Sequence, residues 1–338
     1  MTCRPAAPGT CGTGRTGEQL KVLITGGSGY IGSAVALACK DAGITPVILD
    51  VNADIHSNGM HLARGHISDG RLIDKVYEIH PDIYACIHCA ALTGVPESAA
   101  DPLRYYGVNV AQSLQLAGHL IRNGCRRLIF SSSAAVYAPG PVAVSEDSLL
   151  GPQSPYARTK LACEQLLADL LPLGLRTLSL RYFNPIGADP QLRTGPARPA
   201  HVLGKMMEAQ RTGEPFVITG TDWETRDGTG LRDYVHVWDL AAAHVDAVIR
   251  FDTLPVGVTA VNLGTGQGTT VRELLAYFQE AAGPVRVMAG DRRRGDVAGA
   301  YAVPGLAWEV LGWRAVYPVS EAVGHAVQWR NRMAASGV

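Results

Sequence analysis

Short apolar runs alternate with longer stretches of helical period through the first half of the chain. Between the runs, apolar residues recur three and four positions apart, as on one face of a helix. Strands that are apolar on both faces and separated by helices are typical of a parallel sheet covered on both sides. The pattern therefore predicts an α/β fold with a doubly wound parallel sheet, whose strands are Lys21–Thr25, Thr45–Asp50, Ile83–Cys89, Arg127–Ser132 and Arg176–Tyr182.

The alternation loosens after about Asn184. A stretch rich in proline and glycine follows, and shorter elements lead to a final helix predicted over Val319–Met333. We therefore expect a flexible tail over residues 1–20 and the sheet domain over 21–184. Residues 185–338 are predicted to form mainly a second, smaller lobe, with some segments returning to the sheet domain.

Charge and composition narrow the classes of partner. The chain has 338 residues, with 30 Lys and Arg against 30 Asp and Glu, so its formal net charge is zero. A neutral chain has no overall attraction to phosphate backbones, which argues against a nucleic-acid partner. The length is sufficient for a large hydrophobic core without disulfide or metal support.

Two features of the sequence suggest a membrane span and a metal site at first sight. Residues 22–39 carry no charge, but Gly26, Gly29 and Gly32 interrupt them, so we expect a strand, a turn and a helix there, and no membrane span. Cys86 and Cys89 have the spacing of a metal pair, but residues three apart on a strand face opposite sides, so no metal is predicted. Seven cysteines, an odd number, in mostly apolar segments suggest free thiols in the cytoplasm.

A glycine-rich turn carries the clearest binding signal. Gly26, Gly29 and Gly32 follow the first predicted strand and open a helix, where backbone N–H groups can approach a pyrophosphate. Asp50 ends the second strand, and its carboxylate suits ribose hydroxyls but would repel a 2′-phosphate. The motif therefore predicts that the cofactor is NAD rather than NADP.

A second signal combines a tyrosine, a lysine and a serine. Tyr156 and Lys160 are four residues apart and share one face of a predicted helix, so the ammonium could lower the phenol pKa toward that of a general base. Ser133 follows the predicted strand Arg127–Ser132, at the carboxyl edge of the sheet where ligands bind in doubly wound folds. These three residues are the candidate catalytic group.

Together these segments resemble the extended short-chain dehydrogenase/reductases, and among them the UDP-galactose (UDP-glucose) 4-epimerases. The resemblance runs from about Lys21 to the C-terminus and implies a Rossmann-type fold. It is carried by five motifs in order: Thr25-Gly-Gly-Ser-Gly-Tyr-Ile-Gly32, Ser131-Ser-Ser-Ala-Ala-Val-Tyr137, Ser154-Pro-Tyr-Ala-Arg-Thr-Lys160, Leu180-Arg-Tyr-Phe-Asn-Pro-Ile-Gly187 and Asp227-Gly-Thr-Gly-Leu-Arg-Asp-Tyr-Val-His236.

The resemblance implies epimerisation at C4 of a UDP-hexose, with Tyr156 as base, Lys160 beside it and Ser133 orienting the reacting hydroxyl. It further implies a homodimer, through the helices around 102–122 and 154–170. The NAD contacts it implies are Gly26, Gly29, Tyr30, Ile31, Gly32, Asp50, Ile67, Ala90, Ala91, Asn109, Ser131, Tyr156, Lys160 and Tyr182. The nucleotide-sugar contacts it implies are Ser133, Asn184, His201, Arg232, Arg293, Asp296 and Ala300.

Several positions depart from the epimerase pattern. His66 and Thr93 stand where an acid and a lysine contact the cofactor, and Thr219 stands where a phenylalanine lies near the base. Ala300 stands where a bulky tyrosine restricts the sugar, although Tyr301 is adjacent. We therefore keep two alternatives: an epimerase or oxidoreductase acting on a GDP- or dTDP-linked sugar, and a noncatalytic protein that binds NAD and a nucleotide sugar.

The residues after Ser133 separate the epimerases from the related dehydratases. Dehydratases carry an acidic pair at the next two positions, where this chain has Ala134 and Ala135. Elimination of water needs a positioned acid and base, which two methyl groups cannot provide. A dehydratase is therefore not expected.

Overall fold

The computed structural model describes residues 20–52, 60–139, 143–196, 201–257, 259–292 and 297–335. All but the last residue of the expected tail 1–20 lie outside this part of the chain. The expected substrate contacts Arg293 and Asp296 lie outside it as well.

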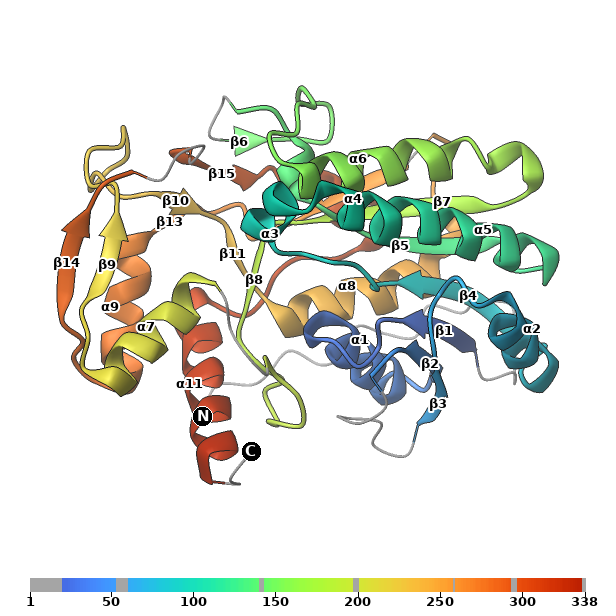
Figure 1. The fold of residues 1–338 in the computed structure, drawn as a ribbon, viewed down its shortest axis with the longest axis horizontal. Coiled ribbons are helices and arrows are strands. Elements are labelled where there is room, and N and C mark those ends of the chain that lie inside the picture. Colours follow the sequence, from blue (N-terminus) through green and yellow to red (C-terminus); the bar gives the residue numbers. More distant parts are fainter. Residues whose placement is uncertain are drawn as a thin grey trace.

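A parallel sheet forms the centre of the molecule (Figure 1). The described residues form seven strands in the order β12-β7-β5-β4-β1-β2-β3, and every neighbouring pair is parallel. This arrangement confirms the predicted Rossmann-type doubly wound sheet. The strands are β1 (Lys21–Thr25), β2 (Thr45–Asp50), β3 (His61–Arg64), β4 (Ile83–His88), β5 (Arg127–Ser133), β7 (Arg176–Tyr182) and β12 (Ala260–Leu263).

The predicted strand boundaries are correct to within one residue. β4 ends at His88 instead of Cys89, and β5 extends to Ser133 instead of Ser132. β3 and β12 are additional strands that the apolar pattern did not predict. Three of the four residues of β3 are charged, basic or small, and β12 has only four residues, so neither forms a long apolar run.

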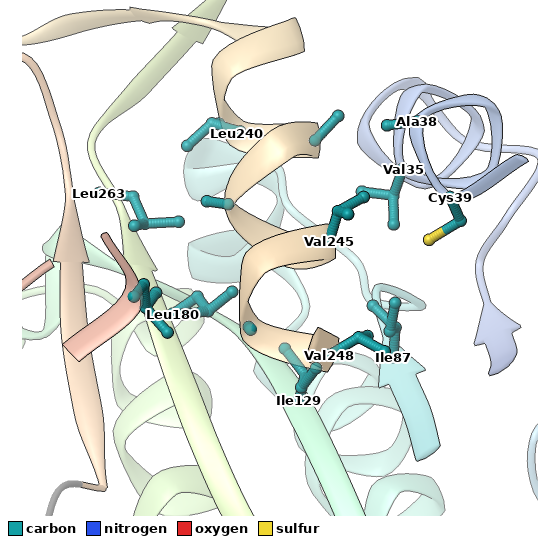
Figure 2. Packing of buried hydrophobic residues seen from close by; sticks show 14 of the residues in the cluster. Val35, Ala38, Cys39, Ile87, Ile129, Leu180, Leu240, Val245, Val248 and Leu263 are labelled. Atoms are coloured by element: carbon teal, nitrogen blue, oxygen red, sulfur yellow. The ribbon is translucent and has the colours of Figure 1, made fainter. Parts of the chain in front are cut away.

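Helices cover both faces of this sheet. On one face, α1, α8 and α10 pack against strand residues such as Ile87, Ile129 and Leu180, and Figure 2 shows Val35 of α1 beside Val245 of α8. On the other face, α2, α5 and α6 enclose a second core. These helices are α1 (Tyr30–Asp41), α2 (Gly70–Ile79), α5 (Gln112–Arg122), α6 (Pro155–Ala168), α8 (Val237–Arg250) and α10 (Gly305–Leu311).

The uncharged stretch of residues 22–39 forms most of β1, the glycine turn and most of α1, as predicted. No helix in the described part of the chain is long and apolar enough to cross a membrane.

The helix expected around residues 102–122 is divided into three pieces. It begins as α4 (Pro102–Tyr105), continues as a π-helix (Tyr106–Ala111) and ends as α5. Asn109 lies within the π-helical turn and is almost fully buried. Such turns widen a helix locally and occur frequently at functional sites.

Several elements after β7 build a smaller lobe at one end of the molecule, on the left in Figure 1, whereas α8, β12 and α10 return to the large sheet. Its core packs α7, α9 and α11 around residues such as Met206, Phe278 and Val323. Thr270 and Glu273 form a capping box that starts α9. The elements are β8 (Asn184–Ile186), α7 (Val202–Thr212), β9 (Phe216–Thr219), β10 (Leu231–Arg232), β11 (Tyr234–His236), β13 (Thr269–Thr270), α9 (Val271–Ala282), β14 (Val287–Gly290), β15 (Gly299–Ala302) and α11 (Val319–Ala335).

Small sheets connect this lobe to the carboxyl edge of the large sheet. β8 pairs with β11, β9 pairs with β14, and β13, β10, β15 and β6 form a four-stranded sheet. The remaining elements are β6 (Ala143–Val144), α3 (Val95–Ala100) and 3-10 turns at Ala134–Val136, Leu171–Leu173 and Phe251–Thr253.

Candidate active site

The glycine turn between β1 and α1 is packed so closely against neighbouring backbone that only glycine fits at two of its positions. Gly26 has φ +71°, and a Cβ there would lie 2.6 Å from the backbone nitrogen of Ala90. A Cβ at Gly32 would collide with the carbonyl of Gly26. The first turn of α1 has no side-chain cap and no acidic residue, so its N–H groups remain available to an anion. The turn fits the pyrophosphate of a dinucleotide.

Asp50 lies beside this turn, at the end of β2. Its carboxylate accepts hydrogen bonds from the backbone nitrogens of Ser28, at 3.0 Å, and Asn52, at 2.9 Å. These bonds hold the acid at the sheet edge while leaving further lone pairs for ribose hydroxyls. The turn and the acid together therefore fit NAD.

α6 brings Tyr156 and Lys160 to the carboxyl end of β5. Ser154 caps the helix by accepting a hydrogen bond from the backbone of Ala157, and Pro155 occupies its first position. The ammonium of Lys160 lies 6.0 Å from the centre of the Tyr156 ring. Ser133 ends β5 and hydrogen-bonds Tyr156. The structure thus brings together the three candidate catalytic residues.

The pKa of Tyr156 differs from the expectation. Burial raises it, and the hydrogen bond from Ser133 opposes that rise. The ammonium of Lys160 donates to the backbone oxygen of Ser131 at 2.7 Å. Burial also lowers the pKa of Lys160. In this arrangement Ser133 is the residue that favours the phenolate, and the expected acidification by Lys160 stays a prediction.

Ser131 connects several groups at this edge. Its carbonyl accepts from Lys160, and its hydroxyl lies 2.8 Å from the Tyr182 hydroxyl and 3.2 Å from Cys89 Sγ. The Tyr182 hydroxyl also contacts His244 Nε2 at 2.5 Å. Cys89, which follows β4, and His244, which lies within α8, were not expected near the site, because neither belongs to the motifs in the sequence.

Asn109 ties α6 to the loop after β4. Its amide donates to the carbonyl of Leu92 and to Thr159 Oγ1, both at 3.0 Å, and its oxygen accepts from the backbone nitrogen of Leu92 at 2.8 Å. Thr159 precedes Lys160 in α6, so the hydrogen bond from Asn109 helps to fix the position of α6. Both amide hydrogens of Asn109 are used by these protein groups.

Four of the other expected cofactor contacts lie around the same turn. Tyr30 begins α1, and its hydroxyl donates to the carbonyl of Gly187 at 2.8 Å. Ile31 is partly buried against the core beneath the sheet. Ala90 and Ala91 follow β4 beside the turn. The side chain of Ile67 is buried in the core with Ile73 and Val76.

The small sheets gather the expected substrate contacts. Arg232 and Ala300 are register partners in β10 and β15, and Asn184 is paired with Tyr234. The Arg232 guanidinium donates to the carbonyls of Leu231 and Ala298. Asp233, which follows Arg232, is fully buried and clamps the adjoining loop by accepting from Thr265, Gly266 and Ala302.

His201 begins α7 and is unusual among the described residues. Both of its ring nitrogens are buried and lack a hydrogen-bond partner in the described part of the chain. Burial lowers its pKa to about 4, so the imidazole is neutral at pH 7. A neutral ring offers one donor and one acceptor to a ligand that could reach it.

The remaining histidine and cysteine predictions concern structural roles. Cys86 lies in the core on one face of the sheet and Cys89 packs toward the other, as expected for positions three apart on a strand. No group of metal-ligating side chains occurs among the residues described. His236 lies 2.9 Å from His325 of α11 and accepts from the backbone of Trp238.

Sequence comparison places the chain in a family. Residues 22–264 match the model of the NAD dependent epimerase/dehydratase family, which covers the sheet domain and part of the second lobe. The chain belongs to the NAD dependent epimerase/dehydratase family. Within it, the UDP-glucose 4-epimerase of Azospirillum brasilense is 42% identical over 318 residues, covering 89% of this chain and 89% of that protein.

Solved structures of the family share the whole fold. A UDP-glucose-4-epimerase from Stenotrophomonas maltophila, with bound NAD and formylated UDP-arabinopyranose, superposes with a TM-score of 0.87 at 34% identity, covering 94% of this chain and 100% of that one. The enzyme from Bifidobacterium longum in complex with NAD+ and UDP gives a TM-score of 0.84 at 32% identity, covering 92% and 98%. The resemblance to the 4-epimerases is thereby confirmed.

Proposed function

We propose that this protein is an NAD-dependent 4-epimerase of a UDP-hexose. The observation that carries the proposal is the grouping of Ser133, Tyr156 and Lys160 at the sheet edge next to a glycine turn and Asp50 that fit NAD. Membership of the family and the identity with UDP-glucose 4-epimerases along most of the chain support it.

The chain supplies the acid–base part of the reaction. Tyr156 takes the proton of the sugar C4 hydroxyl and later returns it, and Ser133 orients that hydroxyl. Bound NAD supplies a reversible acceptor for the C4 hydride. Lys160 holds the cofactor ribose and adds positive charge near the phenol. The keto sugar formed between the two proton transfers presents its other face before reduction, so the net oxidation is zero.

The cofactor is assigned to the residues around the glycine turn. Backbone groups at Gly26, Gly29, Tyr30, Ile31 and Gly32 face the pyrophosphate, and Asp50 takes the ribose hydroxyls. The remaining contacts are Ile67, Ala90, Ala91, Asn109, Ser131, Tyr156, Lys160 and Tyr182. Because Asn109 already bonds Leu92 and Thr159, we assign it an indirect role through the position of α6.

The nucleotide sugar is assigned to the second lobe and to the edge of the large sheet at Ser133. Ser133 and Asn184 lie nearest the reacting sugar, and His201 and Arg232 receive the diphosphate. The buried and unpartnered ring nitrogens of His201 support this assignment, because burial without a partner is costly unless a ligand compensates. Ala300, with Arg293 and Asp296 outside the described residues, completes the set, and its small side chain leaves room for a larger sugar.

We further infer that residues 21–184 bind NAD and that residues 185–338 mainly bind the substrate. Five cysteines of the described chain, Cys39, Cys86, Cys89, Cys125 and Cys163, are free thiols, which supports a cytoplasmic location.

A homodimer is supported by an exposed apolar stripe on one helix surface. Leu103, Tyr106 and Leu114 are 86%, 40% and 45% exposed and follow one another at helical spacing along α4, the π-helix and α5. Apolar side chains in such a row indicate a protein contact, and a second copy of the chain presents a matching row through a two-fold axis.

The function is tested by incubating the purified protein separately with UDP-, GDP- and dTDP-hexoses and following each sugar by proton NMR. We expect UDP-glucose and UDP-galactose to interconvert without net formation of NADH. Turnover of only the GDP- or dTDP-linked sugars would move the substrate assignment to another nucleotide. No turnover of any sugar after NAD is added would contradict the epimerase proposal.

A further inference from the structure

A buried histidine of α8 reaches the candidate active site through a tyrosine. His244 has no exposed surface, and its Nε2 lies 2.5 Å from the hydroxyl of Tyr182, at the end of β7. Its Nδ1 lies 2.7 Å from the carbonyl oxygen of Leu240, one turn earlier in α8. Tyr182 is the register partner of Ser133, so the contact comes within one strand spacing of the candidate catalytic group.

The protonation state of His244 follows from these contacts. Burial lowers its pKa to about 4, so the ring carries a single proton at neutral pH. The Leu240 carbonyl can only accept, and therefore that proton lies on Nδ1. Nε2 is then an acceptor, and the one proton of the Tyr182 hydroxyl is donated to His244.

The number of available protons also determines the direction of the next two hydrogen bonds. The Tyr182 hydroxyl lies 2.8 Å from Ser131 Oγ, which lies 3.2 Å from Cys89 Sγ. Because the Tyr182 proton is already used, both contacts are hydrogen bonds only if Ser131 donates to Tyr182 and the Cys89 thiol donates to Ser131. The opposite order would place the bare Nδ1 lone pair of His244 against the Leu240 carbonyl.

The direction of these hydrogen bonds matters because Ser131 also contacts Lys160. The carbonyl of Ser131 accepts from the Lys160 ammonium at 2.7 Å. A fixed Ser131 side chain therefore steadies the backbone carbonyl to which Lys160 donates. It also leaves Tyr182 Oη as a hydrogen-bond acceptor with its proton directed away from the site.

We propose that His244 is a positioning residue of the cofactor site, which orients the Tyr182 hydroxyl as an acceptor and holds Ser131 in place beneath Lys160. The inference rests on the proposed function, in which Tyr182, Ser131 and Lys160 contact NAD. His244 itself touches none of the reacting atoms. It acts through Tyr182 alone, and this separates the proposal from a general role in packing α8 against the sheet.

The test uses the full-length protein with its bound NAD and two closely matched variants. His244→Asn keeps a donor near Leu240 but is too short to accept from Tyr182, whereas His244→Gln places an acceptor near the position of Nε2. The readout is the rate at which bound NAD exchanges with radiolabelled NAD, together with kcat and KM. His80→Leu is the control, because His80 is also buried but precedes β4 at the opposite end of the sheet.

We expect His244→Asn to speed NAD exchange roughly 2- to 12-fold, the range for one lost hydrogen bond, and to lower kcat with KM for the sugar unchanged. His244→Gln should restore both values, and His80→Leu should leave NAD exchange unchanged. Tyr182→Phe should speed exchange similarly, and adding His244→Asn to it should cause no further change, because both act through one hydroxyl.

The proposal is overturned if His244→Asn exchanges NAD at the wild-type rate, or if its effect multiplies with that of Tyr182→Phe. These results would not affect the proposed function, which rests on the epimerase activity of the wild type. Conversely, a wild type that retains NAD but converts no sugar would remove the proposed function, while the exchange rates would still decide the role of His244. A wild type that retains no NAD would overturn both.

Discussion

Tyr156 is partly buried beside a lysine whose ammonium is directed elsewhere. Burial raises the pKa of the phenol and lowers the pKa of Lys160, and only Ser133 favours the ionised phenol. The polypeptide alone therefore keeps Tyr156 protonated at neutral pH. We infer that the phenol becomes an effective base only when the cofactor and substrate complete the site.

The role of Tyr156 is tested by its replacement with phenylalanine. Tyr156→Phe removes one hydroxyl and should lower kcat about 10²- to 10⁴-fold, the usual contribution of a positioned acid–base group. Tyr84→Phe is a matched control, because the Tyr84 hydroxyl contacts Asp252 on the surface. Steady-state kinetics with unchanged circular dichroism would check the prediction, and wild-type turnover in Tyr156→Phe would show that another group is the base.

His88 shows how a buried histidine affects stability. It lies between Thr25 Oγ1, at 2.7 Å, and Ser113 Oγ, at 2.8 Å, and burial lowers its pKa to about 3. The unfolded chain, with an ordinary pKa near 6.5, binds the proton first as the pH falls. The stability due to neutral His88 is therefore fully present above about pH 6.5 and is lost progressively toward pH 3.

A comparison with His88→Gln isolates this contribution from other titrating groups. The difference in unfolding free energy between wild type and variant should shrink by about 2 kcal/mol between pH 7.5 and pH 5. Urea unfolding at the two pH values measures it. Groups such as Asp239, whose pKa burial raises to about 7, cancel in the difference. A gap that does not change with pH would mean that His88 is protonated in the folded protein.

α6 is held in place by a buried ion pair as well as by packing. Glu164, one turn after Lys160, accepts from the Arg181 guanidinium at 2.7 and 3.0 Å and hydrogen-bonds Ser132. The side chains of Arg181 and Glu164 are only 6% and 9% exposed. The helix that carries Tyr156 and Lys160 is thus fixed against β5 and β7 by the same carboxylate.

Glu164→Gln should destabilise the protein by about 3–5 kcal/mol, because it leaves the Arg181 charge buried without its partner. Chemical denaturation measures this loss. Glu208→Gln provides the contrast, since Glu208 pairs with Arg211 on an exposed surface and its loss should not shift the midpoint. Equal midpoints for Glu164→Gln and wild type would exclude a stabilising role for the buried pair.

The predictability of an element depended on whether its signal was local. β1, β2 and β7 were predicted with correct ends, because β1 and β2 contain a continuous apolar run and β7 alternates leucines with polar residues. β3 and the π-helical turn were missed, since a short edge strand and one extra residue in a helix leave no periodic trace. Motif spacing was sufficient to predict that Ser133, Tyr156 and Lys160 form one catalytic group. His244 could not, because 61 residues separate it from Tyr182 in the sequence.

At the scale of the whole molecule, the exposed stripe of Leu103, Tyr106 and Leu114 includes none of the residues assigned to the cofactor or the substrate. It therefore bears on assembly rather than on chemistry. Burying it between two copies of the chain would remove apolar surface from water on both copies at once.

Leu103→Asp should shift the protein from dimer to monomer, because a charge at the centre of an apolar interface is not compensated. Light scattering coupled to size-exclusion chromatography gives the mass directly. Val256→Asp, on a fully exposed loop after the turn Phe251–Thr253, should leave the mass unchanged. A monomeric wild type, or a Leu103→Asp variant that remains dimeric, would exclude this stripe as the dimer contact.

The central claim is that the hydrogen at C4 of the sugar leaves and returns within one protein molecule. The most direct measurement supplies UDP-galactose deuterated at C4, in ordinary water, and follows the product by NMR. The account predicts UDP-glucose that retains deuterium at C4, since the hydride never exchanges with solvent. Product carrying hydrogen at C4 would contradict it, because the inversion would then proceed by proton exchange.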